Sequence, residues 1–414
     1  MSKNKILQFG EGVFLRGFIE PLIQRMNKEK SFNGEVYAVK PRGGAVPQKF
    51  IDQDCQYNLL TRGIAADNSV VENVEKITCL KQLLSSSEDW VALEELACDK
   101  DLTFIFSNTT EAGIAYDPEN MDTFPGKLAR LLKKRFEAGQ PGVVIMPCEL
   151  IENNGQTLKE YVLRYLNNDP AAEYVEKECR FYDTLVDRIV SGFPADYERF
   201  DANDQLMVAV EPFAFLAVKA PAELLEKLPL PEDVAVLTDD LKAFRTRKVR
   251  CLNASHTCMV SAGLLAGFSE VQELLEDSSF RQRIEQTLFR EILPTVALGE
   301  AGKRAFAESV LQRFANPFAH HKLEAIALNS VAKWKVRILP VILDSRELPY
   351  YLSRSLGELY KRYKLNNATG DTAEVTARFA GDYSLDDFLA DKALWDMDLH
   401  DVPGLADAAR EAAL

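Results

Sequence analysis

Residues 5–16 read Lys-Ile-Leu-Gln-Phe-Gly-Glu-Gly-Val-Phe-Leu-Arg, and the interpretation of the N-terminal half starts from this segment. Residues 5–9 form a short apolar run that predicts a buried strand, and Gly10 and Gly12 indicate a turn. From Val13 to Asn27 the apolar residues recur at helical spacing. A strand, a glycine turn and a helix in this order are typical of a unit that holds a pyrophosphate at the helix N-terminus.

The glycine signature is incomplete. Leu15 occupies the position where the dinucleotide fingerprint has a third small residue, so a simple tight turn is an equal alternative. The second expected strand ends in Lys40 and Arg42, where an acidic residue would hold a ribose hydroxyl. These two cations could instead face a 2′-phosphate, or they could be solvated loop residues. NAD is our expected cofactor, and NADP is not excluded.

Further apolar runs alternate with helical segments, which predicts a mostly parallel sheet covered on both faces. We expect strands at residues 35–40, 103–107 and 143–147, separated by helices at 90–98 and 125–137. Three later runs are expected to extend this sheet: residues 205–210, 213–218 and 234–237. From Asp240 onward only helix-length amphipathic segments remain: residues 243–265, 271–293, 303–314, 322–343, 350–363 and 405–414.

The predicted fold class is therefore α/β: an N-terminal Rossmann-like doubly wound sheet with added strands, followed by a mostly α-helical C-terminal domain. We place a dinucleotide-binding domain at residues 1–240 and a helical substrate and catalytic domain at residues 241–414. No Gly/Ser-rich linker and no internal repeat separates them.

Composition narrows the function. The 414 residues carry a formal net charge of −14, which disfavours nucleic acid and anionic membrane surfaces as partners. Seven scattered cysteines and four histidines show no metal-ligand spacing, and the adjacent His320 and His321 would point apart on a helix, so we expect no metal. The absence of a signal peptide or a transmembrane run predicts a cytoplasmic protein. A monomer and a homodimer both remain open.

A second segment carries candidate chemistry. Lys248, Asn253 and His256 follow the pattern Lys-x4-Asn-x2-His. At about 100° per residue on a helix, all three side chains could face one cleft of the protein. An alcohol dehydrogenase without a metal needs one group for the hydroxyl proton and others for the developing carbonyl oxygen. The alternative is the start of a basic helix with a core asparagine and histidine.

Six segments in order along the chain resemble the polyol-specific long-chain dehydrogenases, a family that includes mannitol dehydrogenases and hexuronate reductases. They are QFGEGVFLR at 8–16, FSNTTEAGI at 106–114, PCELI at 147–151, TLVDRIV at 184–190, RKVRCLNASHT at 247–257, and RFANP at 313–317 continuing through His321 to IALN at 326–329. One departure is the pair Glu149-Leu150, where many members have Asp-Asn.

This resemblance implies roles for single residues. Lys248 would be the general acid/base, and Asn253 and His256 would bind and polarise the reacting oxygen. The cofactor phosphates would meet Gly10, Gly12 and Arg16, and the nicotinamide half would meet Asn108, Thr109, Thr110 and Glu111. Asp187 and Arg313 would line the substrate cleft. The alternatives are a surface ion pair for Asp187 with Arg188, and a helix C-cap for Arg313.

The resemblance also implies an activity: reversible, NAD(H)-dependent and metal-independent reduction of a keto-hexuronate such as tagaturonate to the aldonate altronate. Fructuronate, mannitol or a sugar-alcohol phosphate would be alternative substrates within the family. A nicotinamide-binding regulatory protein without turnover is the alternative from another class.

Overall fold

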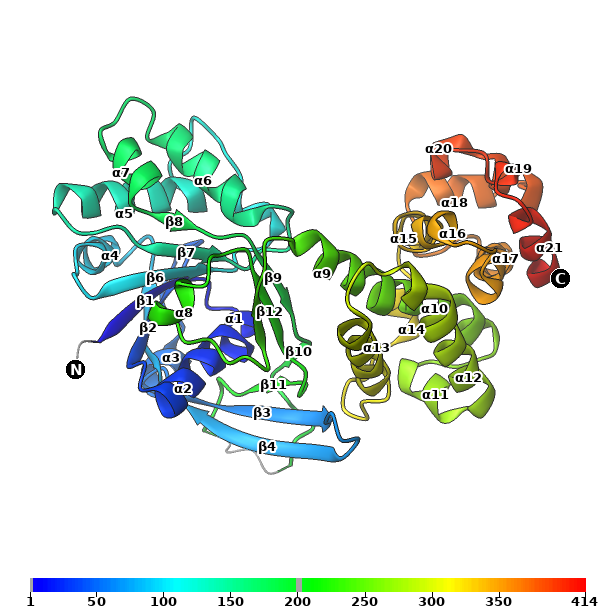
Figure 1. The fold of residues 1–414 in the computed structure, drawn as a ribbon, viewed down its shortest axis with the longest axis horizontal. Coiled ribbons are helices and arrows are strands. Elements are labelled where there is room, and N and C mark those ends of the chain that lie inside the picture. Colours follow the sequence, from blue (N-terminus) through cyan, green and yellow to red (C-terminus); the bar gives the residue numbers. More distant parts are fainter. Residues whose placement is uncertain (1–2, 199–202) are drawn as a thin grey trace. The chain divides into compact units, whose positions relative to one another are not determined.

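The computed structural model describes residues 3–198 and 203–414. Its contacts divide the chain into two compact units (Figure 1). The first comprises residues 1–62 and 70–241, and the second comprises residues 63–69 and 242–414. Within the described ranges, no helix is both long and apolar enough to span a membrane.

The first unit is built on a six-stranded sheet in the order β5-β2-β1-β6-β7-β8, in which all neighbouring strands are parallel. Its strands are β1 (Asn4–Phe9), β2 (Gly34–Lys40), β5 (Leu80–Ser85), β6 (Leu102–Ser107), β7 (Val144–Pro147) and β8 (Arg180–Phe181). The predicted Rossmann-like parallel sheet is confirmed. Strand β5 was not expected, because its leucines, lysine and glutamine suit a helix equally well.

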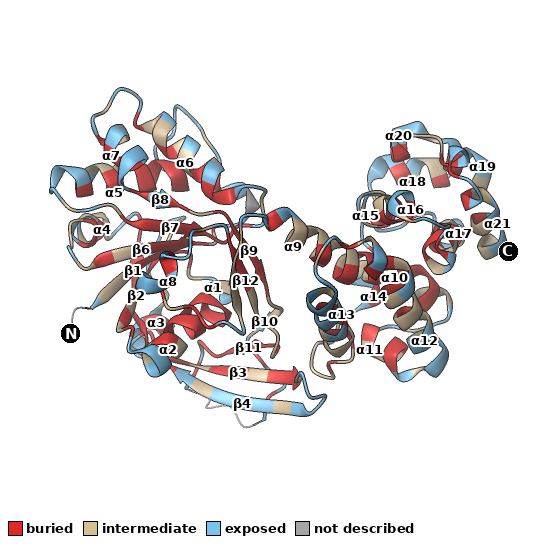
Figure 2. Ribbon diagram, viewed as in Figure 1, coloured by how far each residue is buried: buried red, intermediate tan, exposed pale blue. Residues whose placement is uncertain are grey.

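The two faces of this sheet bury alternate residues of each strand, as the pleat requires. Ile6 and Phe104 lie in a core shared with the helices that follow the glycine turn, α1 (Val13–Gly17) and α2 (Ile19–Lys30). Leu7 and Ile105 lie in a second core. The helices of that opposite layer are α4 (Trp90–Ala97), α5 (Phe124–Glu137), α6 (Asn154–Tyr165) and α7 (Ala171–Lys177). Figure 2 shows the central strands buried and the outer helix faces exposed.

The later strands form two small sheets of their own, so the prediction that they extend the main sheet is wrong. One sheet has the order β10-β11-β3-β4 and the other β13-β12-β9. Their strands are β3 (Tyr57–Ile64), β4 (Val70–Ile77), β9 (Thr184–Asp187), β10 (Val190–Gly192), β11 (Val208–Val210), β12 (Phe215–Val218) and β13 (Ala235–Leu237). An apolar run predicts that a strand is buried, but it does not indicate which other strand will pair with it.

The second unit is helical, as predicted, but several expected long helices are interrupted. The helix expected at 271–293 breaks at Asp277, whose side chain accepts backbone N–H bonds and caps the next helix. The one expected at 322–343 breaks at Asn329, where φ is +53°. The principal helices are α9 (Leu241–Lys248), α10 (Ser255–Leu265), α11 (Val271–Glu276), α12 (Ser278–Gln286), α13 (Glu300–Phe314), α14 (Leu323–Ile326), α15 (Ser330–Arg337), α16 (Leu339–Asp344), α17 (Tyr350–Asn366) and α21 (Leu405–Ala413).

Candidate active site

The glycine turn lies at the carboxyl end of β1, beside β6. Gly10 has φ +121°, and a Cβ there would lie 2.8 Å from the carbonyl oxygen of Asn108. Only glycine fits this position without strain. A Cβ on Gly12 would meet no atom within 4 Å. Gly10 is therefore required by the fold, whereas Gly12 leaves open space at the start of α1.

A buried polar network supports the turn from below. The Gln8 side-chain amide donates to the Gly10 carbonyl (3.0 Å) and to the Glu20 carboxyl (2.8 Å). The Tyr57 hydroxyl lies 2.8 Å from the other carboxyl oxygen of Glu20. Burial raises the pKa of Glu20, and the hydrogen bonds from Gln8 and Tyr57 oppose that rise. The turn thus rests on a carboxyl group that the interior favours in its neutral form.

Arg16 also belongs to this interior. Its guanidinium is buried and donates to the backbone carbonyls of Leu206 and, at 3.3 Å, Glu11. It also lies over the rings of Phe50 and Tyr57. These contacts give Arg16 a structural role between α1 and the segment before β11, and its contact with a cofactor phosphate stays a prediction.

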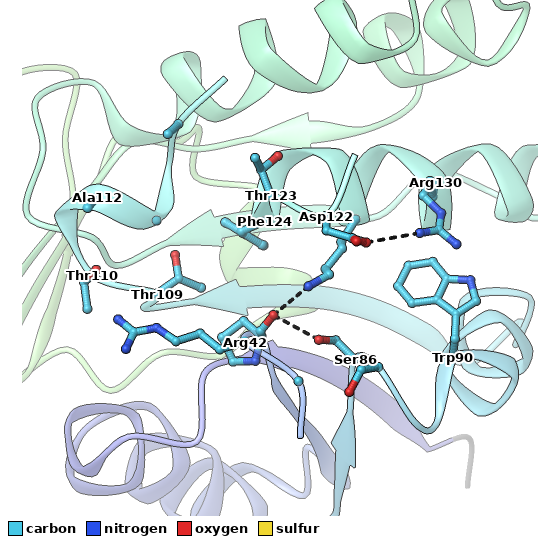
Figure 3. A pocket seen from close by; sticks show the side chains of 16 residues that line it. Arg42, Ser86, Trp90, Thr109, Thr110, Ala112, Asp122, Thr123, Phe124 and Arg130 are labelled. Carbon is cyan, nitrogen blue, oxygen red and sulfur yellow. Dashed lines mark hydrogen bonds and ion pairs between the residues drawn. The ribbon is translucent and has the colours of Figure 1, made fainter. Parts of the chain in front are cut away.

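A cavity of about 840 Å³ opens at the carboxyl ends of β2, β5 and β6. Figure 3 shows the Arg42 side chain running along it beside Thr109 and Thr110. The Pro41 carbonyl anchors one wall by accepting hydrogen bonds from Lys127 Nζ (2.7 Å) and from a serine hydroxyl after β5. Lys40 does not line the cavity, because its Nζ donates to the carbonyl of Ala45 at 3.2 Å.

The turn after β6 is held by a buried carboxylate. Thr109 donates its backbone N–H (2.8 Å) and its hydroxyl (2.9 Å) to one oxygen of Glu149, and the Ser107 hydroxyl donates to the other at 2.9 Å. Asn108 donates to the carbonyl of Cys148 at 2.8 Å. Burial raises the pKa of Glu149, and the bonds from Thr109 and Ser107 lower it. In the sequence, Glu149 stood out only as a departure from the Asp-Asn pair that many family members have.

Two neighbours in the same turn were also predicted to contact the nicotinamide half. Thr110 is exposed, and its φ of +78° with ψ of +165° is a conformation that nearly only glycine adopts. The side chain of Glu111 lies outside the described residues, although its backbone begins a short 3₁₀ turn.

Asp187 ends strand β9 and is buried, with 4% of its surface exposed. The guanidinium of its neighbour Arg188 donates to the backbone carbonyls of Gly17 (2.9 Å) and Glu211 (2.9 and 3.1 Å). Burial lowers the pKa of Arg188 to about 10. Asp187 is therefore not a surface residue at a helix end, because it is buried at the end of a strand.

In the helical unit, the segment with Lys248, Asn253 and His256 is not a regular helix. Lys248 ends α9, a π-helical turn (η2, Val249–Ala254) contains Asn253, and His256 lies in the first turn of α10. The Thr257 hydroxyl donates to the Asn253 carbonyl at 2.9 Å. The wider turn changes the angles expected for a regular α-helix, and π-turns are frequent at functional sites.

In the described part of the chain, His256 carries a buried polar atom without a partner, as does the Ser255 hydroxyl beside it. Its Nε2 is buried and has no hydrogen-bond partner among the residues that the structure describes. Its ring lies 4.3 Å from that of Phe314 and 5.9 Å from that of His321, centroid to centroid. Burial lowers the pKa of His256 well below 6.5, and the charges of His321 and Arg313 add to this effect. The imidazole is therefore neutral and able to hydrogen-bond a ligand.

Arg313 and His321 join His256 from other segments. Arg313 lies in the last turn of α13 with 4% of its surface exposed, and its charge lowers the pKa of both histidines. Burial is the larger cause of the lowered pKa of His321. In the sequence, His321 lies within the segment of family resemblance that begins at Arg313.

Among the described residues, no group of three or more His, Cys, Asp or Glu side chains is arranged to hold a metal ion.

Comparisons with known proteins agree with this architecture. Curated relatives named altronate oxidoreductase include one from Halalkalibacterium halodurans, 41% identical over 386 residues that cover 87% of this chain and 75% of the relative. Another, from Bacillus subtilis, is 36% identical over 438 aligned positions that cover 98% and 91%.

Two solved structures share the fold. A D-sorbitol dehydrogenase in substrate-free form has a TM-score of 0.80 at 21% identity, covering 99% of this chain and 92% of that one. The Pseudomonas fluorescens mannitol 2-dehydrogenase ternary complex with NAD and D-mannitol has a TM-score of 0.71 at 18% identity, covering 100% and 91%. Sequence profiles of the mannitol dehydrogenase Rossmann domain and C-terminal domain match residues 4–230 and 240–413, so the chain belongs to the mannitol dehydrogenase family.

Proposed function

We propose that this protein catalyses the reversible, NAD(H)-dependent reduction of the keto-hexuronate tagaturonate to the aldonate altronate. The substrate assignment is supported by relatives named altronate oxidoreductase that align with most of the chain. The reaction type rests on one observation, the buried and unpartnered Nε2 of a neutral His256, which is suited to hydrogen-bond a carbonyl or hydroxyl oxygen.

The residues of the first unit fit a dinucleotide. The open space at Gly12 and the cavity beside Arg42 provide room and positive charge at the carboxyl ends of the strands, where such ligands bind in open α/β sheets. We assign dinucleotide binding to residues 1–240 and the substrate to residues 241–414. Arg42, together with the lack of an acidic residue at the end of β2, keeps NADP as the alternative to NAD.

A nicotinamide bound here supplies or accepts the hydride. In our proposal, Lys248 gives the proton to the carbonyl oxygen during reduction and takes it back in the reverse direction. Asn253 and His256 hold that oxygen by hydrogen bonds, and the neutral His256 does so without adding a full charge. Asp187 and Arg313 are proposed to contact the substrate.

A substrate panel tests the proposal. Loss of reduced nicotinamide is followed with tagaturonate, fructuronate and fructose, each with NADH and with NADPH. We expect rapid loss with tagaturonate and NADH. Activity confined to fructuronate or to fructose would keep the family and replace the substrate. Tight NADH binding without turnover of any sugar would favour the regulatory alternative.

The protein's surroundings are part of the proposal. All seven cysteines are free and most are buried, which fits a reducing compartment such as the cytoplasm. Monomer and homodimer remain the two expected states, and sedimentation of the purified protein distinguishes them.

A further inference from the structure

Helix α15 carries two positive side chains on one face, Lys333 and Arg337, spaced four residues apart. Both are partly buried. Lys333 Nζ donates to the backbone carbonyl of Ile326 at 2.8 Å, and Arg337 Nη1 donates to the Thr257 hydroxyl at 3.2 Å. Neither forms an ion pair with an acidic side chain in the part of the chain that the structure describes.

This arrangement is costly without a ligand. Like charges at this helical spacing repel each other, and burial lowers the pKa of both side chains. The acidic group that acts on Lys333 is Asp371, but its carboxylate accepts bonds from the Val331 N–H (3.1 Å) and from the Tyr363 hydroxyl. The chain holds 63 acidic residues against 49 basic ones, yet places none of the described carboxylates against these two cations.

The two cations face the candidate site. Helix α15 packs on α10 and on the π-turn η2. Arg337 bonds to Thr257, the residue after His256, and the Thr257 hydroxyl in turn bonds to the Asn253 carbonyl. The charges of Arg337 and Lys333 also reach the His256 ring, where they add to that of Arg313. The charges of three cations therefore act on one imidazole whose Nε2 has no described partner.

We propose that Lys333 and Arg337 bind the carboxylate of the sugar-acid substrate and so select a uronate over an uncharged sugar or polyol. The inference rests on the proposed function and assigns it a specificity site. Of the five N–H donors of Arg337, one is directed at Thr257, which leaves others for a carboxylate. Lys333 adds a point charge on the same helix face.

The test compares tagaturonate with tagatose, the same keto sugar with a hydroxymethyl group in place of the carboxylate. In Arg337→Gln and Lys333→Gln, the KM for tagaturonate should rise about 10- to 100-fold, the usual effect of losing a charge-assisted hydrogen bond. The efficiency with tagatose should not fall. Lys335→Gln is the matched control, since Lys335 lies on the same helix but pairs with Asp396 at 2.6 Å. It should keep the wild-type KM.

A binding measurement supplies a second readout. Calorimetric titration of the NADH-loaded protein with altronate, a pair that cannot react, should show weaker binding in both variants, while the affinity for the neutral alditol altritol stays constant. Wild-type KM values in both variants, or equal losses with tagaturonate and tagatose, would overturn the carboxylate site. A wild-type protein that fails to reduce tagaturonate would overturn the proposed function itself. If Arg337→Gln does not fold, Lys333→Gln carries the test.

Discussion

The two glycines of the turn after β1 have different tasks, which single substitutions can separate. Gly10→Ala places a Cβ against the Asn108 carbonyl at a left-handed φ, and we expect it to lower the free energy of unfolding by about 1–3 kcal/mol. Gly12→Ala meets no neighbour and should leave stability unchanged, but it should weaken NADH binding by filling the open space at α1. Thermal unfolding and a fluorescence titration with NADH measure the two effects. Equal behaviour of the two variants would contradict this division.

Lys248 is the residue on which the proposed proton transfer depends. Replacing it with alanine removes the group but no part of the first unit, so turnover of tagaturonate should fall about 10²- to 10⁴-fold. NADH affinity should stay at the wild-type value, as measured by the same titration. Near-normal turnover in this variant would remove Lys248 from the reaction.

Glu20 makes stability depend on pH. Its pKa in the folded protein is raised above the ordinary 4.5, chiefly by burial, so its contribution is fully present below that value and is lost as pH rises through the folded pKa. Glutamine cannot titrate. We therefore expect the stability of Glu20→Gln relative to wild type to increase from acidic to mildly alkaline pH, measured by urea unfolding. A constant difference would show that the pKa of Glu20 is the same in the folded and unfolded protein.

At the scale of single elements, the turn after β6 stores strain next to the proposed nicotinamide site. Thr110 adopts a conformation that costs about 1–3 kcal/mol for a residue with a side chain, so Thr110→Gly should stabilise the protein by that amount. Thr110→Ala keeps the strain and removes only the hydroxyl, which makes it the control. If the strain positions the turn, the glycine variant will be more stable but slower. A glycine variant no more stable than the alanine variant would contradict the strain.

The sequence predicted elements whose signals are local. The strand, glycine turn and helix at residues 5–27 were legible because burial, turn and helix signals follow one another directly. Strand β4 could not be predicted, since most of its residues are exposed and its apolar pattern is weak. The π-turn η2 has no compositional signature, because it arises from how α9, α10 and their neighbours pack.

The candidate site divides in the same way. Lys248, Asn253 and His256 lie within one segment, so their spacing alone suggested a shared role. His321 and Arg337 reach the same imidazole from distant parts of the chain, and only tertiary packing brings them there. A single sequence contains no direct record of such contacts.

At the scale of the whole molecule, cofactor binding should slow hydrogen exchange of backbone amides in one unit and not in the other. A cofactor at one hundred times its dissociation constant stabilises the state that binds it by about 2.7 kcal/mol. With NADH, hydrogen exchange should therefore slow in β1, β2 and β6 of the first unit and stay unchanged in α17 and α21 of the second. Uniform slowing across both units would contradict the assignment of the dinucleotide to the first.

The order of the parallel sheet has a consequence for how the protein is made. Strand β1 lies at its centre, and its partner β6 comes almost a hundred residues later, with Lys5 opposite Leu102. At about 5–20 residues per second, a ribosome needs about 5–20 s to add the intervening chain. During that interval the backbone of β1 lacks its β6 partner, and the later helices that cover Leu7 on one face of the sheet have not yet been made. The nascent chain is thus most prone to aggregation early in its synthesis, and slower, cooler expression or a chaperone that covers its first strands should raise the yield of folded protein.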